Sequence, residues 1–168
     1  EDISATSENG RTKGIVSTCT NTGDIFADTN VGGIVGSISI DVSFDREDDL
    51  NISEFFSGSA KYLIYACVSD CRSYSDITAT AAAGGTVGRM DYGVVRFCSS
   101  AGKITAAEQY SGGITGYCHG PVSNCMSRAV MSSGSYCGGI AGLGTNIAAC
   151  LAMPSLGNRC EYIGSIAG

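Results

Sequence analysis

One pentapeptide recurs along this chain of 168 residues, and its recurrence limits the folds that the chain can adopt. The five copies are GGIVG (32–36), GGTVG (84–88), GGITG (112–116), GGIAG (138–142) and GSIAG (164–168). After a first interval of double length, the copies follow one another with a period of about 26 residues. Internal periods of about 20 to 50 residues mark solenoids, propellers and other arrays, so the spacing indicates a repeat protein.

Three other slots keep the same period. A cysteine stands half a period before each motif (Cys19, Cys71, Cys98, Cys125, Cys150). An aliphatic residue stands three positions before each cysteine (Val16, Val68, Val95, Val122, Ile147), and another apolar residue six positions after it (Ile25, Ile77, Ile104, Met131, Leu156). The slot directly before the cysteine varies (Thr18, Asp70, Phe97, Asn124, Ala149). Fixed apolar slots of this kind are expected to form an inward-facing core, with the cysteines in one buried column.

A unit of about 26 residues is shorter than the roughly 33 to 50 residues of helical repeats and propeller blades. Its short β-branched pieces, separated by Gly, Ser and Asn, predict an all-β, single-domain parallel β-helix (a β-solenoid) of five or six coils over residues 1–168. A glycine at a fixed slot then means either a positive φ or no room for a Cβ. The residue after each glycine pair is expected to point into the core (Ile34, Thr86, Ile114, Ile140, Ile166).

The motif also carries a family resemblance. The run from Val122 to Cys125, followed by GGIAG, resembles the GLUG-motif repeats of secreted and cell-surface bacterial proteins, which also occur beside the catalytic domain of some immunoglobulin A-cleaving metallopeptidases. The resemblance covers nearly the whole chain except residues 41–61 and the first dozen. It implies a surface-exposed β-solenoid region and carries over no catalytic residue.

The doubled first interval contains the one irregular stretch, near 38–56, and residues 41–61 are predicted to be an insertion within the domain. Apolar residues alternate on both sides of DREDD (45–49), which is a hairpin signal, whereas a degenerate coil is the alternative. The acidic tip (Asp45, Glu47, Asp48, Asp49) is a candidate partner-binding surface.

Composition narrows the function classes. Ten Lys and Arg against sixteen Asp and Glu argue against a nucleic-acid partner. No segment is apolar enough to be expected to span a membrane, since the most apolar window (137–153) is interrupted by glycines. The acidic start and the end on a repeat motif suggest a segment of a larger protein.

Metal and cofactor chemistry is not expected. Five of the nine cysteines belong to the repeat, and the other four (Cys67, Cys118, Cys137, Cys160) could form disulfides. Cys67 and Cys71 form the only close cysteine pair, without a second pair at zinc spacing, and His119 is the sole histidine, beside a Gly-Pro turn. We therefore predict no metal and no cofactor.

Tyr110, Tyr136 and Tyr162 each lie two positions before a glycine motif, at the spacing of the repeat. On stacked coils they are expected to form an aromatic ladder, which either stabilises the coil edge or binds a glycan or a host or cell-surface protein. A polysaccharide-active enzyme would need carboxylates that converge on neighbouring coils. Asp24 and Asp76 occupy the same slot of their coils, but in the next three coils this slot holds Lys103, Val130 and Ser155, so no acidic ladder is expected.

These observations predict a non-catalytic extracellular repeat domain of a bacterial surface or secreted protein, serving as an adhesin-type binding module or spacer. The alternative is a polysaccharide-active β-helix enzyme, a lyase or a glycosidase.

Overall fold

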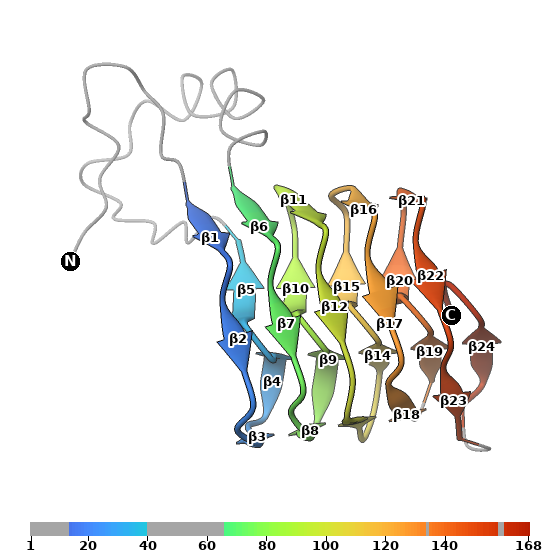
Figure 1. Cartoon of the computed structure of the whole chain (residues 1–168). Coiled ribbons are helices and arrows are strands. Elements are labelled where there is room, and N and C mark those ends of the chain that lie inside the picture. Colours follow the sequence, from blue (N-terminus) through green and yellow to red (C-terminus); the bar gives the residue numbers. More distant parts are fainter. Residues whose placement is uncertain (1–13, 40–65, 134, 158–159) are drawn as a thin grey trace, which may run out of the picture.

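The structure, a computed structural model, describes residues 14–39, 66–133, 135–157 and 160–168. These residues form an all-β solenoid, as the repeat predicted: every strand pairs in parallel with the equivalent strands of the neighbouring coils. Figure 1 shows the successive coils side by side, from blue at the first described coil to red at the last. No helix occurs within the described ranges.

Five sheets run along the solenoid, and the strands of successive coils stack in each of them. The first sheet contains β1 (Ile15–Ser17), β6 (Cys67–Ser69), β11 (Val94–Arg96), β16 (Val122–Ser123) and β21 (Ile147–Ala148). The second contains β2 (Thr20–Asn21), β7 (Arg72–Ser73), β12 (Ser99–Ser100), β17 (Met126–Ser127) and β22 (Leu151–Ala152). The third contains β3 (Ile25–Phe26), β8 (Ile77–Ala79), β13 (Lys103–Ala106), β18 (Val130–Ser133) and β23 (Ser155–Leu156).

The two remaining sheets flank the glycine motif. The fourth sheet contains β4 (Thr29–Gly32), β9 (Ala81–Gly84), β14 (Tyr110–Gly112), β19 (Tyr136–Gly138) and β24 (Tyr162–Gly164). The fifth contains β5 (Val35–Ile38), β10 (Val87–Met90), β15 (Thr115–Cys118) and β20 (Ala141–Gly144), and a bridge from Ala141 to Ala167 continues it into the last coil. The motif therefore sits at the corner where the chain turns from the fourth sheet into the fifth.

The coils on either side of the irregular stretch pair directly with each other. Ile15 is in register with Cys67, Ile25 with Ile77, and Val35 with Val87. The same pairing holds in the other two sheets, so no coil lies between these two and the degenerate-coil alternative is wrong. The predicted hairpin lies outside the described residues, as do Asp45, Glu47, Asp48 and Asp49.

The core consists of the predicted apolar slots. One cluster combines the aliphatic slot, the cysteine slot and the slot after the glycine pair, and its central members are fully buried (Val68, Cys71, Val95, Cys98, Ile114, Val122, Cys125, Ile140). A second cluster contains Ile77, Ile104 and Met131 from the slot six positions after the cysteine. The inward assignment is confirmed for the inner coils, whereas Ile166 in the last coil is 38% exposed.

The five repeat cysteines form the predicted column. The backbone N–H of Cys98 lies 3.5 Å from Cys125 Sγ, and that of Cys125 lies 3.5 Å from Cys150 Sγ. Cys71, Cys98 and Cys125 are buried, whereas Cys19 at one end of the column is exposed and Cys150 is half-buried. The ends differ because burial of a rung requires a coil on both sides.

The four other cysteines are also free thiols. Cys118 lies in the first core cluster, whereas Cys160 packs against the second, which contains Cys137. Burial, reinforced by the neighbouring Cys160, raises the pKa of Cys137 to about 12. Burial also raises the pKa of Cys118. Both thiols are therefore protonated at neutral pH and behave as small apolar core residues.

A column of mostly small residues runs along the second sheet. Asn21, Ser73, Ser100, Ser127 and Ala152 are in register in the second sheet. Ser73, Ser100, Ser127 and Ala152 each face the second glycine of the preceding coil's motif: a Cβ built on Gly113 would lie 2.0 Å from Ser127 Oγ and 2.2 Å from the carbonyl oxygen of Gly139. Neither glycine of the pair has a positive φ, so lack of space for a Cβ explains the repeated letters.

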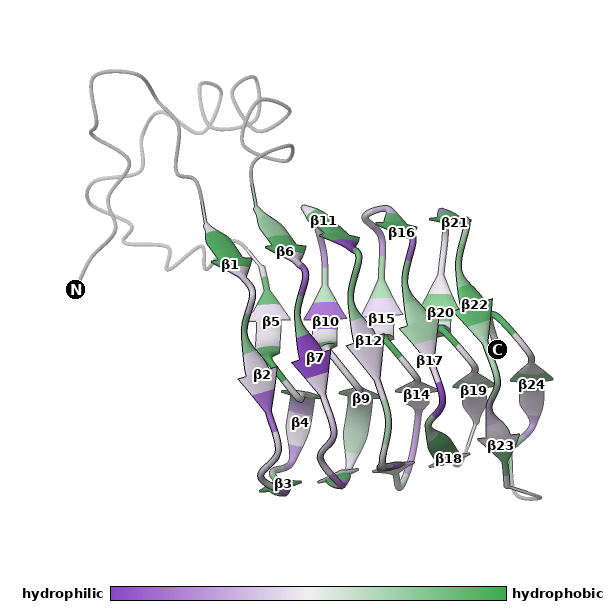
Figure 2. Cartoon of the chain, in the orientation of Figure 1, coloured by the Kyte–Doolittle hydropathy of each residue, from purple (hydrophilic) through white to green (hydrophobic). Residues whose placement is uncertain are grey.

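The outward positions of the same sheet are free to vary, because they contact solvent rather than a neighbouring rung. In Figure 2, β7 is hydrophilic because it begins with Arg72, whereas β22 begins with Leu151 and is hydrophobic. The inward partners Ser73 and Ala152 remain small in both strands. In this sheet the period is therefore visible only at the inward slots.

The slot directly before each repeat cysteine has a left-handed backbone in every coil. Its five occupants have φ between 51° and 56° (Thr18, Asp70, Phe97, Asn124, Ala149). Left-handed geometry costs an ordinary L-residue about 1–2 kcal/mol, and Asn is several-fold enriched there. Asn124 therefore suits this turn, whereas Phe97, which is 54% exposed, has little side-chain burial to offset the strain.

We expect Phe97→Asn to stabilise the protein by about 0.5–1 kcal/mol, because Asn tolerates the left-handed geometry better than an aromatic residue does. Chemical denaturation followed by circular dichroism measures the change. Phe26→Asn is the matched control, since Phe26 is 81% exposed but lies in the regular strand β3. Equal changes in the two variants would show that the backbone conformation at residue 97 carries no strain.

Candidate functional site

The predicted tyrosine ladder is present on the outer surface of the fourth sheet. Tyr110, Tyr136 and Tyr162 begin β14, β19 and β24 and are in register. The rings of Tyr110 and Tyr136 are stacked at 5.2 Å with 28° between their planes, and those of Tyr136 and Tyr162 at 4.7 Å with 12°. The stacking is thus confirmed, whereas the binding role stays a prediction.

Strand alternation explains why these rings point outward. The next residue in two of the strands, Ser111 or Cys137, is fully buried, so the tyrosine before it faces the opposite side of the sheet. Tyr110 and Tyr136 are half-buried by their neighbours in the ladder, and Tyr162 at its end is 54% exposed. The ladder therefore presents ring edges and one open ring to solvent.

A second outward row runs beside the ladder, on the fifth sheet. Arg89 is in register with Tyr117, and Tyr117 with Leu143. The Tyr117 ring contacts the Tyr110 ring at a centroid distance of 5.3 Å, and the Arg89 guanidinium carbon lies 5.1 Å from the Tyr117 ring centroid. We call the continuous row from Tyr162 through Tyr136, Tyr110 and Tyr117 to Arg89 the aromatic strip.

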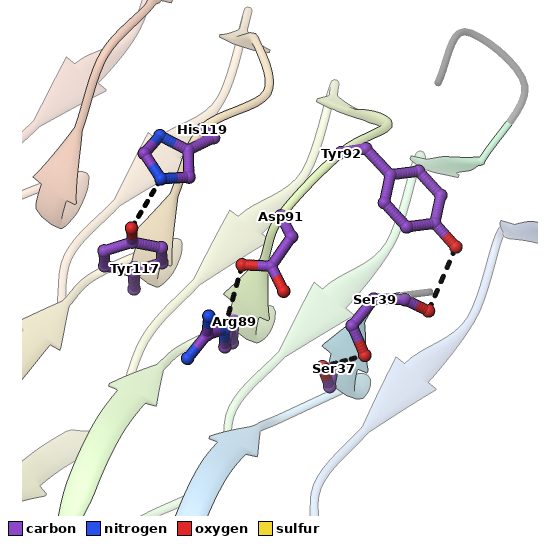
Figure 3. A network of polar contacts seen from close by, with 7 residues as sticks. All are labelled: Ser37, Ser39, Arg89, Asp91, Tyr92, Tyr117 and His119. Carbon is purple, nitrogen blue, oxygen red and sulfur yellow. Dashed lines mark hydrogen bonds and ion pairs between the residues drawn. The ribbon is translucent and has the colours of Figure 1, made fainter. Parts of the chain in front are cut away.

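Polar groups surround the Arg89 end of the strip, and Figure 3 shows them together. Arg89 Nε donates a hydrogen bond to Asp91 Oδ1 at 2.9 Å, an ion pair of two partly exposed side chains. The Tyr117 hydroxyl is hydrogen-bonded to Nε2 of the exposed His119, and their rings meet edge to face at 4.9 Å. Charged and hydrogen-bonding groups thus lie at one end of an otherwise aromatic surface.

Tyr92 lies beside the Arg89 end of the strip, on the side of the first coil. Its hydroxyl donates to the backbone carbonyl of Ser39 at 3.1 Å. Burial, and after it the charge of Asp91, raises the pKa of Tyr92, so the hydroxyl remains a donor at neutral pH. This bond ties the turn after β10 to the last described residue of the first coil.

Sequence reasoning identified the ladder but missed Tyr117, Arg89 and Asp91. The usable signal was the slot directly after the motif, where strand alternation places residues 37, 89, 117 and 143 outward and in register. Its occupants differ from coil to coil, so no repeated letter marks it. His119, predicted to be a turn residue, lies in the bend after β15 and is also hydrogen-bonded to the strip.

The other sequence candidates have structural roles. Asp24 Oδ1 accepts the backbone N–H of Asp76 at 3.0 Å, and Asp76 Oδ1 accepts that of Lys103 at 2.7 Å. Each carboxylate thus fastens the turn of the next coil. Within the described ranges, no three His, Cys, Asp or Glu side chains are gathered around a common point where a metal ion could bind.

Residues 14–39, 66–133, 135–157 and 160–168 include no helix of the length and hydrophobicity needed to cross a membrane. We compared the chain with protein-family models, curated proteins and solved structures, and none of them matches it. The resemblance to GLUG-motif repeats therefore stays a prediction, and the geometry of the aromatic strip is the basis for a functional proposal.

Proposed function

We propose that this chain is a non-catalytic binding module of a bacterial secreted or cell-surface protein, and that it binds carbohydrate on the aromatic strip. The observation that carries the proposal is the stacked ladder of Tyr110, Tyr136 and Tyr162 on the outside of the solenoid. The extracellular, adhesin-type setting is supported only by the resemblance of the repeats to GLUG-motif regions.

The chemistry of the strip suits a sugar chain. Tyrosine offers a large apolar ring with a polar hydroxyl and only two rotatable side-chain bonds, so it contacts a ligand at low entropic cost. The C–H groups of pyranose rings can contact the exposed ring edges of the ladder and the open ring of Tyr162, and the sugar hydroxyls can bond to neighbouring polar groups. Because the coils repeat, the ladder offers equivalent rings with centroids 4.7 Å and 5.2 Å apart, a regular surface for a polymer of repeated units.

The rigidity of the scaffold favours binding over a mobile or catalytic role. Each ladder tyrosine is the first residue of a strand hydrogen-bonded to its neighbouring coil, so the rings are held in place before a ligand arrives. The glycosidase form of the enzymatic alternative needs a pair of free carboxylates, and three described candidates are already bonded, Asp24 and Asp76 to backbone amides and Asp91 to Arg89.

We expect the protein to be retarded by at least one member of a panel of soluble polysaccharides in affinity electrophoresis. Tyr136→Ala should weaken that binding by about ten-fold, because an aromatic contact contributes about 0.5–1.5 kcal/mol beyond its buried area. Tyr136→Phe keeps the ring and should retain most of the affinity.

A matched pair separates binding from stability. Tyr162 and Tyr74 are both 54% exposed, but Tyr74 lies outside the strip, between β7 and β8. Tyr162→Ala should weaken binding, whereas Tyr74→Ala should not. The melting temperatures of both variants show whether any loss of binding reflects a loss of stability. Equal binding by all these variants would contradict the proposal, and release of new reducing or unsaturated ends from a bound polymer would favour the enzymatic alternative.

A further inference from the structure

We infer that the ligand of the aromatic strip is an acidic polysaccharide containing uronic acids, and that Arg89 binds its carboxylate. This inference rests on the proposed function. The bonding of Arg89 and the distribution of charge along the strip support it.

The Arg89 guanidinium has hydrogen-bond donors that its ion pair with Asp91 does not use. Its bond to Asp91 uses Nε, and within the described part of the chain the two terminal nitrogens of the guanidinium have no partner. The side chain is 45% exposed, so these nitrogens are reachable from solvent. A guanidinium presents paired N–H donors in a plane, which match the two oxygens of a carboxylate.

Two contacts hold the guanidinium in place. Asp91 fixes one edge of the group at 2.9 Å, and the Tyr117 ring supports its face at 5.1 Å. Because Tyr117 also contacts Tyr110, the free edge of Arg89 adjoins the row of rings on which the sugars would lie. Asp91 is thus a positioning residue, and it offsets part of the charge of Arg89 without blocking its terminal nitrogens.

The charges along the strip give the ligand a direction. Arg89 lies at the end of the strip nearest the first coil, whereas Glu161 directly precedes Tyr162 at the other end. At the first end, where Asp91 offsets part of the charge of Arg89, the terminal N–H donors of Arg89 attract a carboxylate, whereas Glu161 repels one at the second end. The strip therefore favours a chain with a carboxylate over Arg89 and its uncharged ring faces over the tyrosines.

Polygalacturonate and alginate, each compared with its fully esterified form, test this inference. Esterification keeps the polymer backbone and removes the negative charge. We expect the affinity for the acid form of a bound polymer to be about ten-fold higher than the affinity for its ester. A charge-assisted pair contributes more binding free energy than a neutral hydrogen bond. Added salt should reduce the difference, since the pair is partly exposed.

Variants of Arg89 assign the preference to this residue. Arg89→Gln should abolish the preference for the acid form, so that this variant binds the acid and ester forms equally. Arg89→Lys keeps the charge but not the planar donor pair, so it should retain only part of the preference. Arg96→Gln, at an exposed arginine of β11, is the control and should bind like the unmodified protein.

The outcomes separate the two proposals. Equal binding of acid and ester forms, or an acid preference that survives Arg89→Gln, overturns the uronate inference and leaves the carbohydrate-binding proposal in place. If the protein binds neither form of these polymers and none of the neutral polymers of the panel, both the uronate inference and the carbohydrate-binding proposal are overturned.

Discussion

Ile140→Asp should destabilise the protein by about 4 kcal/mol or more, because it places an unpaired charge in a closed part of the core. Ile140 has no exposed surface and belongs to a rung that continues from Ile114 to Ile166. The backbone bonds from Ile114 N to Ile140 O and from Ile140 N to Ile166 O, both 2.8 Å, leave no route for the carboxylate to reach water by a small shift of the coil.

Lys103→Ala is the control for this substitution. Lys103 is the exposed first residue of β13, so the change should alter the free energy of unfolding by less than about 0.5 kcal/mol. Urea denaturation followed by circular dichroism gives both values. Similar values for the two variants would refute the inward position of Ile140 and with it the register of the coils.

Gly113→Ala should cost about 3 kcal/mol or more, because a Cβ at this position meets both a side chain and a backbone. The added atom would lie 2.0 Å from Ser127 Oγ and 2.2 Å from Gly139 O. Rotation of the serine would move only Oγ, because Ser127 Cβ would still lie 2.6 Å from the added atom. The carbonyl oxygen belongs to the neighbouring coil and cannot move without separating the two coils.

Gly23→Ala provides the comparison, since a Cβ there meets only Asn21 Oδ1 at 3.7 Å. We expect a change within about 0.5 kcal/mol at this exposed site. Thermal unfolding of the two variants side by side tests the difference. If Gly113→Ala were as mild as Gly23→Ala, the glycine pairs would not mark close packing of coils.

The fold could be predicted because in a solenoid each coil meets the same demands as the coil below it. Inward slots such as those of Val95 and Cys98 therefore repeat as letters, and their common period also predicted the stacking of the tyrosines. The glycine pair repeats for a steric reason that applies equally in every coil.

Other structural features do not correspond to a repeated amino-acid type in the sequence. The left-handed slot before each cysteine constrains only the backbone, so residues as different as Phe97 and Asn124 occupy it. Arg89 and Tyr117 share an outward slot where solvent accepts most side chains, and only the structure brings them together beside Tyr110. Cys19 is exposed because it lies at the end of the cysteine column. The repeat motif is the same in every coil and does not distinguish an end coil from an inner one.

The aromatic strip is the central claim, and NMR spectroscopy of the tyrosine ring protons during titration with a uronate oligosaccharide tests it most directly. We predict that the signals of Tyr110, Tyr117, Tyr136 and Tyr162 shift with a common saturation curve while those of Tyr74 remain unchanged. Absence of a shift at saturating oligosaccharide, or shifts at Tyr74 that match those of the strip, would contradict the account.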